Sequence, residues 1–154
     1  METFLSKEKN PLQRMVVDGG YCAIFRTIAC IGDSLSSGEF DFIEPNGKGS
    51  GIDLYEYSWG QFLARDIGAK VYNFSQGGMT AKDYVQWYAN DNGFWNEDKL
   101  AQAYIIALGV NDIINRNITI GSVSDIDKND YQKNKETFAG YYGEIIQKIT
   151  MRDT

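Results

Sequence analysis

Three apolar runs, each followed by a turn and a helical pattern, dominate the distribution of hydrophobic and polar positions. The first covers residues 21–31 and stops at Gly32, the second covers residues 70–75, and the third covers residues 103–108. Short runs rich in β-branched and aromatic residues that end in a turn are typical of buried strands. The third run is the most apolar, which predicts a central strand covered on both faces.

Helical patterns alternate with these runs. Ser58 is placed to cap a helix over residues 59–67, and Thr80 is placed to cap a helix that continues through Tyr88. An apolar stripe at helical spacing predicts a last helix over residues 131–149. Strand-then-helix units in succession predict a parallel sheet. The fold class is therefore an α/β, doubly wound parallel sheet in a three-layer αβα sandwich.

The chain divides into an arm and one domain. We expect residues 1–22 to form an N-terminal arm and residues 23–154 to form the α/β domain. The segment 36–57 is rich in Gly, Ser and Asp, which favours a binding loop over a linker. Its aromatic residues either wall an acyl or sugar pocket or pack against one another, and the pattern leaves both open: they are Phe40, Phe42, Tyr55, Tyr57 and Trp59.

Composition narrows the classes of partner. The chain has 154 residues, a formal net charge of −6 and no cluster of Lys or Arg, so we expect no nucleic-acid partner and no membrane. No apolar run reaches the roughly 18 residues that span a bilayer, which favours a cytoplasmic protein. Two cysteines are too few for a disulfide framework, and we expect Cys22 and Cys30 to be free thiols.

Each predicted strand ends in a turn that contains Gly or Ser, and ligands of open α/β sheets bind at these carboxyl ends. Ser34 offers a hydroxyl and a backbone N–H, Gly78 an unobstructed backbone N–H, and Asn111 a side-chain amide. Taken singly, each residue also fits an ordinary cap or turn. Together they supply the nucleophile and the oxyanion donors that acyl transfer from an ester needs.

Three sequence blocks resemble, in order and position, the first three blocks of the GDSL (SGNH) hydrolase family: Gly32-Asp-Ser-Leu35, Asn73-Phe-Ser-Gln-Gly-Gly78 and Gly109-Val-Asn-Asp112. The resemblance implies a flavodoxin-like SGNH hydrolase fold and an acyl-serine intermediate formed on Ser34. It also implies an oxyanion hole from the Ser34 N–H, Gly78 and Asn111, with Gly77 as a less favoured register. The expected substrate is a small acyl ester, and we expect neither a cofactor nor a metal.

The chain departs from the family pattern in its last block. That block is Asp-x-x-His, in which the His is the general base, and this chain contains no histidine. We expect an N-terminal portion truncated after the third strand and its helix, nearly inactive alone, rather than a complete chain that lost its base. An open sheet edge at residues 103–108 would then favour homo-oligomers. The alternative function is a non-catalytic module that binds a small molecule or carbohydrate.

Two other motifs are weaker. Residues 125–130 with Glu136 match EF-hand positions one, three, five and twelve, but position six is Asp130 instead of Gly. We therefore expect these acidic residues to favour the start of a helix near Tyr131 and not to bind calcium. A nucleotide-binding Rossmann domain is disfavoured, because the turn after the first strand lacks the required glycine spacing.

Overall fold

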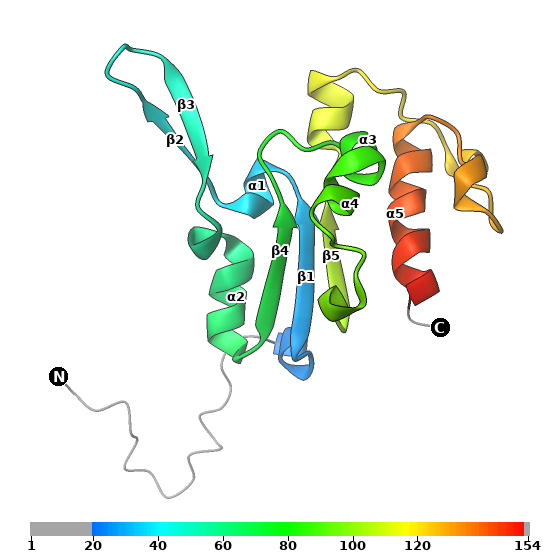
Figure 1. Cartoon of the computed structure of the whole chain (residues 1–154), viewed down its shortest axis with the longest axis horizontal. Helices are drawn as coiled ribbons and strands as arrows, with labels where there is room; N and C mark the ends of the chain where they lie inside the picture. The colour runs from blue at the N-terminus through cyan, green and yellow to red at the C-terminus, as the bar shows by residue number, and fades with distance from the viewer. Residues whose placement is uncertain (1–19, 153–154) are drawn as a thin grey trace, which may run out of the picture.

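The computed structural model describes residues 20–152 (Figure 1). Its centre is a parallel sheet of three strands in the order β4-β1-β5, formed by β1 (Thr27–Gly32), β4 (Lys70–Ser75) and β5 (Ala103–Ala107). Gly32 at the end of β1 pairs with Ser75 of β4 and with Ala107 of β5. The carboxyl ends of the three strands are therefore level at one edge of the sheet.

Helices cover both faces of this sheet. Ile28 and Cys30 of β1 belong to one core, which α2 (Trp59–Ile67) covers, whereas Ala29 and Ile31 belong to the larger core on the other face. The larger core is covered by α5 (Phe138–Arg152) and by a helix made of α3 (Ala81–Asp83), the π-helical turn Tyr84–Tyr88 and α4 (Ala89–Asp91). The prediction of a doubly wound parallel αβα fold is confirmed.

The predicted helix caps are also confirmed. Ser58 Oγ accepts a hydrogen bond from the N–H of Gln61 at 3.4 Å, and Thr80 Oγ1 accepts one from the N–H of Asp83 at 2.9 Å. Each cap satisfies a backbone donor that the first helical turn leaves without a partner. The helices therefore begin where the sequence predicts.

Two boundaries were predicted wrongly. β1 begins at Thr27, because Gly20–Ile24 form a 3₁₀-helix in place of strand. The last helix begins at Phe138, not near residue 131, because the Oγ1 of Thr137 accepts the N–H of Gly140 at 3.1 Å and caps the helix there. Tyr131–Lys133 form a separate 3₁₀-turn.

The apolar third strand, predicted to be central, has in this sheet the open edge that we expected at residues 103–108 of a truncated chain. β5 lies at an edge of the described sheet and its residues are only partly buried, whereas β1 lies in the centre. The sheet places the first strand between two later ones, as a doubly wound fold does. An apolar strand is one whose faces are covered by other elements, and this does not depend on its place in the sheet. Here α5 and its neighbours cover a face of β5, although β5 lies at the edge.

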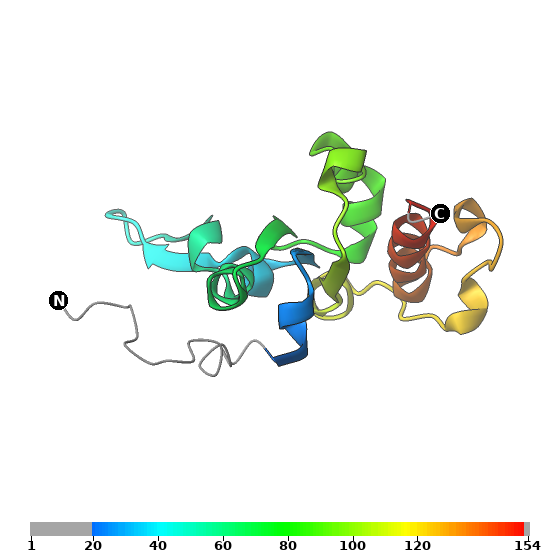
Figure 2. The ribbon, with the colours of Figure 1, turned by 90° about the horizontal axis from the view of Figure 1, so that it is seen from below.

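The segment predicted as a binding loop is mostly a β-hairpin. After the single helical turn α1 (Ser34–Ser37), β2 (Glu39–Ile43) pairs antiparallel with β3 (Gly49–Asp53), and Tyr55–Tyr57 form a 3₁₀-turn. The connection is closed by the N–H of Glu44 on Lys48 O at 2.8 Å. Figures 1 and 2 place this hairpin at one end of the molecule and α5 at the other.

The remaining described segments are short. Glu97–Lys99 and Val123–Asp125 are 3₁₀-turns, and Asn111–Asn115 form a π-helical turn. The predicted N-terminal arm, residues 1–22, falls mostly outside the described residues. Both cysteines are free, and burial raises the pKa of the Cys30 thiol to about 11. No helix within residues 20–152 is long and apolar enough to cross a membrane.

Candidate active site

The carboxyl ends of β1, β4 and β5 lead into three turns that hydrogen-bond to one another. The N–H of Gln76 donates to Gly32 O at 3.3 Å, which joins the second turn to the first. Nδ2 of Asn111 donates to Met79 O at 3.1 Å and to Asp33 Oδ2 at 3.4 Å, which joins the third turn to both others. The three turns predicted to share one crevice therefore lie together.

Ser34 begins the single helical turn α1, directly after the first strand. Asp33 caps this turn, since its Oδ1 accepts the N–H of Leu35 at 3.1 Å, and Gly38 ends the turn with a φ of +80°. The side chain of Ser34 is partly exposed. Within residues 20–152, neither its Oγ nor its N–H has a hydrogen-bond partner. Both groups are therefore free to meet a substrate.

Gly78 occupies the third position of a β-turn, Gln76 to Met79. The Met79 N–H closes this turn on Gln76 O at 3.2 Å, and Gly78 has a φ of +74°, close to the value of about +80° that defines a type II turn. Gly78 is exposed, and no atom lies within 4 Å of the position that a Cβ would take. Its N–H has no acceptor in the described part of the chain, so a substrate oxygen can approach it.

Gly77 faces the hairpin instead. Its N–H donates to Asp53 Oδ2 at 3.2 Å and to Asp53 Oδ1 at 3.3 Å. A Cβ on Gly77 would collide with the carboxylate of Glu39. Because the Gly77 N–H already has an acceptor, the geometry favours Gly78 over Gly77 as the donor to a substrate.

Asn111 is buried, with 8% of its surface exposed, and its amide orientation is fixed. Its Oδ1 accepts from Nδ2 of Asn115 at 2.6 Å, so its own Nδ2 is the atom directed at the first two turns. The bond from Nδ2 to Asp33 is long at 3.4 Å and correspondingly weak. A substrate oxygen could replace that bond without disturbing the one to Met79.

Asp112 has a role in this site that the sequence analysis missed. It is fully buried, and its two carboxylate oxygens accept from the N–H of Ala81 at 2.9 and 3.0 Å. Burial raises the pKa of the Asp112 carboxyl, and the backbone donors oppose this rise. Asp112 thus fixes the start of α3, directly after the second turn. The sequence feature that could have indicated this role is a charged residue, Asp112, shortly after an apolar strand.

The hairpin adds carboxylates that the sequence analysis also missed. A cavity of about 260 Å³ lies between the hairpin and the second turn, lined by Glu39, Gly51, Asp53, Gln76 and Gly77. Desolvation raises the pKa of Glu39, and the charges of Asp53 and Asp41 raise it further. The alternation of acidic and aromatic residues in β2 was the sequence signal for a strand with one acidic face.

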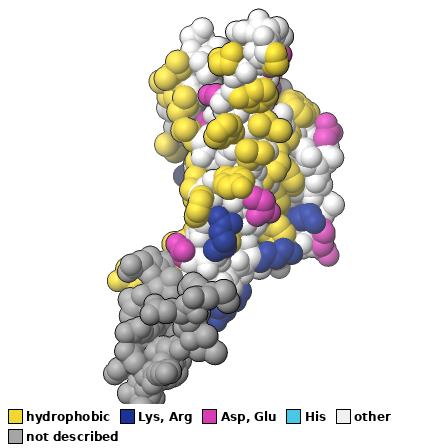
Figure 3. All heavy atoms as spheres, turned by 90° about the vertical axis from the view of Figure 1, so that its left-hand side faces the viewer, with side chains coloured by type: hydrophobic (Ala, Val, Ile, Leu, Met, Phe, Trp, Pro, Cys, Tyr) yellow, Lys and Arg dark blue, Asp and Glu magenta, His cyan; other side chains and the backbone are white. Residues whose placement is uncertain are grey.

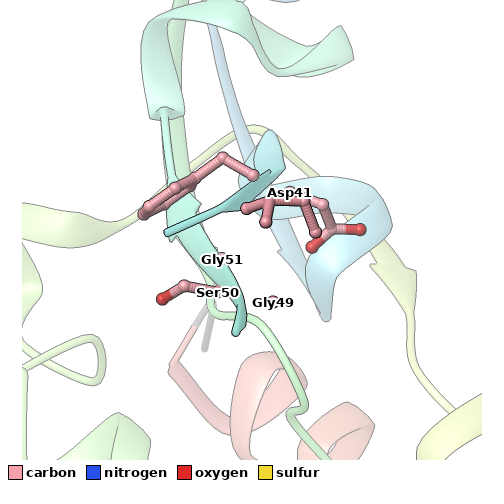
Figure 4. A pocket seen from close by; sticks show the side chains of 6 residues that line it. Asp41, Gly49, Ser50 and Gly51 are labelled. Atoms are coloured by element: carbon pink, nitrogen blue, oxygen red, sulfur yellow. The ribbon is translucent and has the colours of Figure 1, made fainter. Parts of the chain in front are cut away.

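A larger cavity, of about 500 Å³, lies on the outer part of the hairpin (Figure 4). Its lining is Asp41, Phe42, Ile43, Gly49, Ser50 and Gly51, and it includes no residue of the three turns. Phe40 and Phe42 are 61% and 43% exposed. Of the two interpretations that the sequence left open, packing of the aromatic residues against one another therefore does not describe these two.

The acidic residues 125–130 have partners within the protein. Asp125 pairs with Nζ of Lys135 at 2.8 Å, and this contact lowers the pKa of the Asp125 carboxyl. Asp130 caps the short turn Tyr131–Lys133 through the N–H of Gln132 at 3.1 Å. Within residues 20–152, no group of three or more His, Cys, Asp or Glu side chains is arranged to hold a metal ion.

Comparison with known proteins gives one match. A family model described as GDSL-like Lipase/Acylhydrolase matches residues 28–153, a span that includes all three turns. No curated protein and no solved structure matches the chain. The match covers most of the chain, and the same turns that the sequence blocks single out lie together in the fold.

Proposed function

Because the chain belongs to the family of GDSL-like lipases and acylhydrolases, we propose that its three turns cleave a small carboxylic ester through an acyl-serine intermediate. Family membership supports an acylhydrolase kind of function. The finer proposal rests on two groups that have no hydrogen-bond partner within residues 20–152, the Ser34 hydroxyl and the Gly78 N–H. They lie on turns that hydrogen-bond to each other.

In this mechanism the Oγ of Ser34 attacks the ester carbonyl, the bond to the alcohol oxygen breaks, and water later hydrolyses the acyl-serine. The carbonyl oxygen becomes an oxyanion that accepts from the N–H groups of Ser34 and Gly78 and from Nδ2 of Asn111. These donors are held in place before the reaction by the hydrogen bonds among the turns. Loss of one such donor typically slows acyl transfer by about 100- to 1000-fold.

The proton of Ser34 needs a base that the 154 residues do not supply, because the chain contains no histidine. No carboxylate of residues 20–152 hydrogen-bonds to the Ser34 hydroxyl either. We therefore place the base, the imidazole of the family's Asp-x-x-His block, outside these residues. The chain alone should then retain only the small part of the rate enhancement that an oxyanion hole gives without its base.

A short acyl group on a neutral alcohol, such as an acetylated carbohydrate, fits this site best. The net charge of −6 and the carboxylates of Glu39 and Asp53 beside the second turn would repel an anionic alcohol portion. Ser34 is partly exposed and Gly78 is exposed, which suits a substrate whose alcohol portion remains in solvent.

The absence of histidine favours a second candidate, a non-catalytic module that binds a small acyl or carbohydrate ligand at the same turns. Binding needs the free N–H groups but no base. The N–H groups of Asn111 already have acceptors in Met79 and Asp33, which also suits a site that holds its ligand through fewer donors.

Chemical rescue separates the two functions. The purified chain is incubated with p-nitrophenyl acetate and increasing concentrations of imidazole, and transfer of one acetyl group to the protein is followed by intact-protein mass spectrometry and peptide mapping. We expect acetylation of Ser34 that increases with imidazole and is absent in Ser34→Ala. Ser50→Ala, a serine on the hairpin, is the matched control and should behave as the wild type. No Ser34-dependent acetylation at any imidazole concentration rejects the hydrolase.

A further inference from the structure

The hairpin has two chemically different faces. Glu39 and Asp53 pair across the two strands and share a face with Asp41, whereas Phe40 pairs with Ile52 on the opposite face. The acidic face meets the second turn, because both Glu39 and Asp53 contact Gly77. Figure 3 shows the side of the molecule at the hairpin and α2, where hydrophobic side chains outnumber charged ones.

Asp53 is the point at which the hairpin joins the catalytic turns. Its carboxylate accepts the N–H of Gly77 at 3.2 and 3.3 Å, and its Oδ1 also accepts from Oγ of Ser37, the last residue of α1. Ser37 is fully buried and Asp53 is partly exposed, so this contact is partly shielded from solvent. One carboxylate therefore joins the helical turn that begins with Ser34 to the turn that carries Gly78.

The second turn needs such a contact because two glycines form its centre. Glycine backbones have few steric restraints, so the position of the Gly78 N–H depends on how firmly the turn is held by its neighbours. The N–H of Gln76 donates to Gly32 O, which holds the start of the turn against the end of β1. Asp53 holds the next peptide, between Gln76 and Gly77, through the Gly77 N–H, and joins it to Ser37 of α1.

We propose that Asp53 is a positioning residue, which holds the Gln76–Gly77 peptide against α1 so that the N–H of the adjacent Gly78 stays in place relative to Ser34. The catalytic role of Asp53 in this inference rests on the proposed function. The effect of Asp53 on the turn can be measured without catalysis. A negative charge beside an oxyanion site opposes oxyanion formation, so the contribution of Asp53 lies in its acceptor oxygens and not in its charge. Asn keeps an acceptor at this position and Ala does not.

The first test observes the Gly78 amide directly by ¹H–¹⁵N NMR of the full chain. The wild type and Asp53→Asn should each give one sharp Gly78 signal at closely similar positions. Asp53→Ala should shift, broaden or double this signal, because the turn, no longer joined to α1, samples more than one position. Asp41→Ala removes a carboxylate from the same hairpin face without a hydrogen bond to the turn, and should leave the signal unchanged. An unchanged Gly78 signal in Asp53→Ala overturns the proposal.

The second test measures the imidazole-dependent acetylation of Ser34. Asp53→Ala should lower the saturating rate constant about tenfold, part of the hundredfold or more that complete loss of an oxyanion donor costs, without changing the half-saturating ester concentration. Asp53→Asn and Asp41→Ala should react as fast as the wild type or faster. Equal losses in Asp53→Asn and Asp53→Ala would show that charge matters instead, and would overturn the proposal.

The acetylation experiment and the NMR experiment can contradict the two proposals independently of each other. If the wild type shows no Ser34-dependent acetylation, the proposed function fails while the NMR comparison still decides whether Asp53 orients Gly78. The N–H of Leu54 donates to Gly38 O at 3.0 Å, which closes the base of the hairpin through the backbone alone. This second anchor should keep the hairpin folded in Asp53→Ala. Circular dichroism and a thermal melt of each variant check this directly.

Discussion

The parallel sheet and the β2–β3 hairpin are both made of short strands, but they are stabilised in different ways. Ile28 and Ile31 of β1 are each 1% exposed, whereas every residue of β2 is exposed. Two helical layers bury the sheet, and an isolated two-stranded hairpin is at best marginally stable in water. The sheet thus fixes where the three turns lie. The hairpin, held at its base by Asp53, adjusts one of them.

The largest difference between the two regions should appear in unfolding experiments. Ile31→Ala removes a buried side chain from the larger core and should lower the free energy of unfolding by about 2–5 kcal/mol. Phe40→Ala on the hairpin, where the ring is 61% exposed, should change it by no more than about 0.5 kcal/mol. Urea denaturation followed by circular dichroism measures both. Similar losses would show that the hairpin is buried in solution.

A smaller and local effect should follow a change in the hairpin connection. Gly47 has a φ of +82°, so Gly47→Ala should cost about 1–2 kcal/mol of backbone strain. Amide hydrogen exchange should then become faster in β2 and β3 and stay unchanged in β1. Gly49→Ala is the matched control, because Gly49 has equal space around it but no positive φ. Faster exchange in β1 would mean that sheet and hairpin unfold together.

The smallest effect concerns pH. The pKa of Glu39 is raised in the folded protein, first by desolvation and then by Asp53. A raised acid contributes stability that is fully present below its unfolded pKa and is lost as pH rises through its folded pKa. The hairpin should therefore be held more firmly in mild acid. Asp53→Asn should lower the pKa of Glu39 toward its ordinary value of about 4.3, as NMR titration of the carboxyl can show. Asp98→Asn, remote from this face, should not.

The difference between the two regions also explains what the sequence could predict. Burial between two layers of helices leaves continuous apolar runs, and these predicted β1, β4 and β5 with the turns that follow them. The hairpin leaves only alternation, in Glu39-Phe-Asp-Phe-Ile43, and a turn signal in Asn46-Gly47. Because the segment is rich in Gly, Ser and Asp, its composition alone predicts a loop at both places. The centre of the sheet was missed for another reason, since strand order is a property of the topology.

The residues of the candidate site also fall into two groups, those that local sequence predicts and those that depend on distant contacts. The placement of Ser34, Gly78 and Asn111 on neighbouring turns could be predicted, because each stands a few residues after a strand whose end is visible in the sequence. Asp53 could not, because it meets Gly77 across 24 residues of chain, through a hairpin that had not been recognised. The contact of Asp112 with Ala81 spans 31 residues and has the same character. Pairings of this kind depend on the packed fold and not on local pattern.

The edge position of β5 has a consequence for how stability is measured. In the described part of the chain, β5 pairs with β1 on one side and has no strand on the other. Unpaired backbone groups along such an edge can bind a strand of another chain, which is the association expected from the sequence. Association of folded chains stabilises them by mass action, so the unfolding temperature would rise with protein concentration. A dilution series, and not a single melt, is then the measure of this protein's stability.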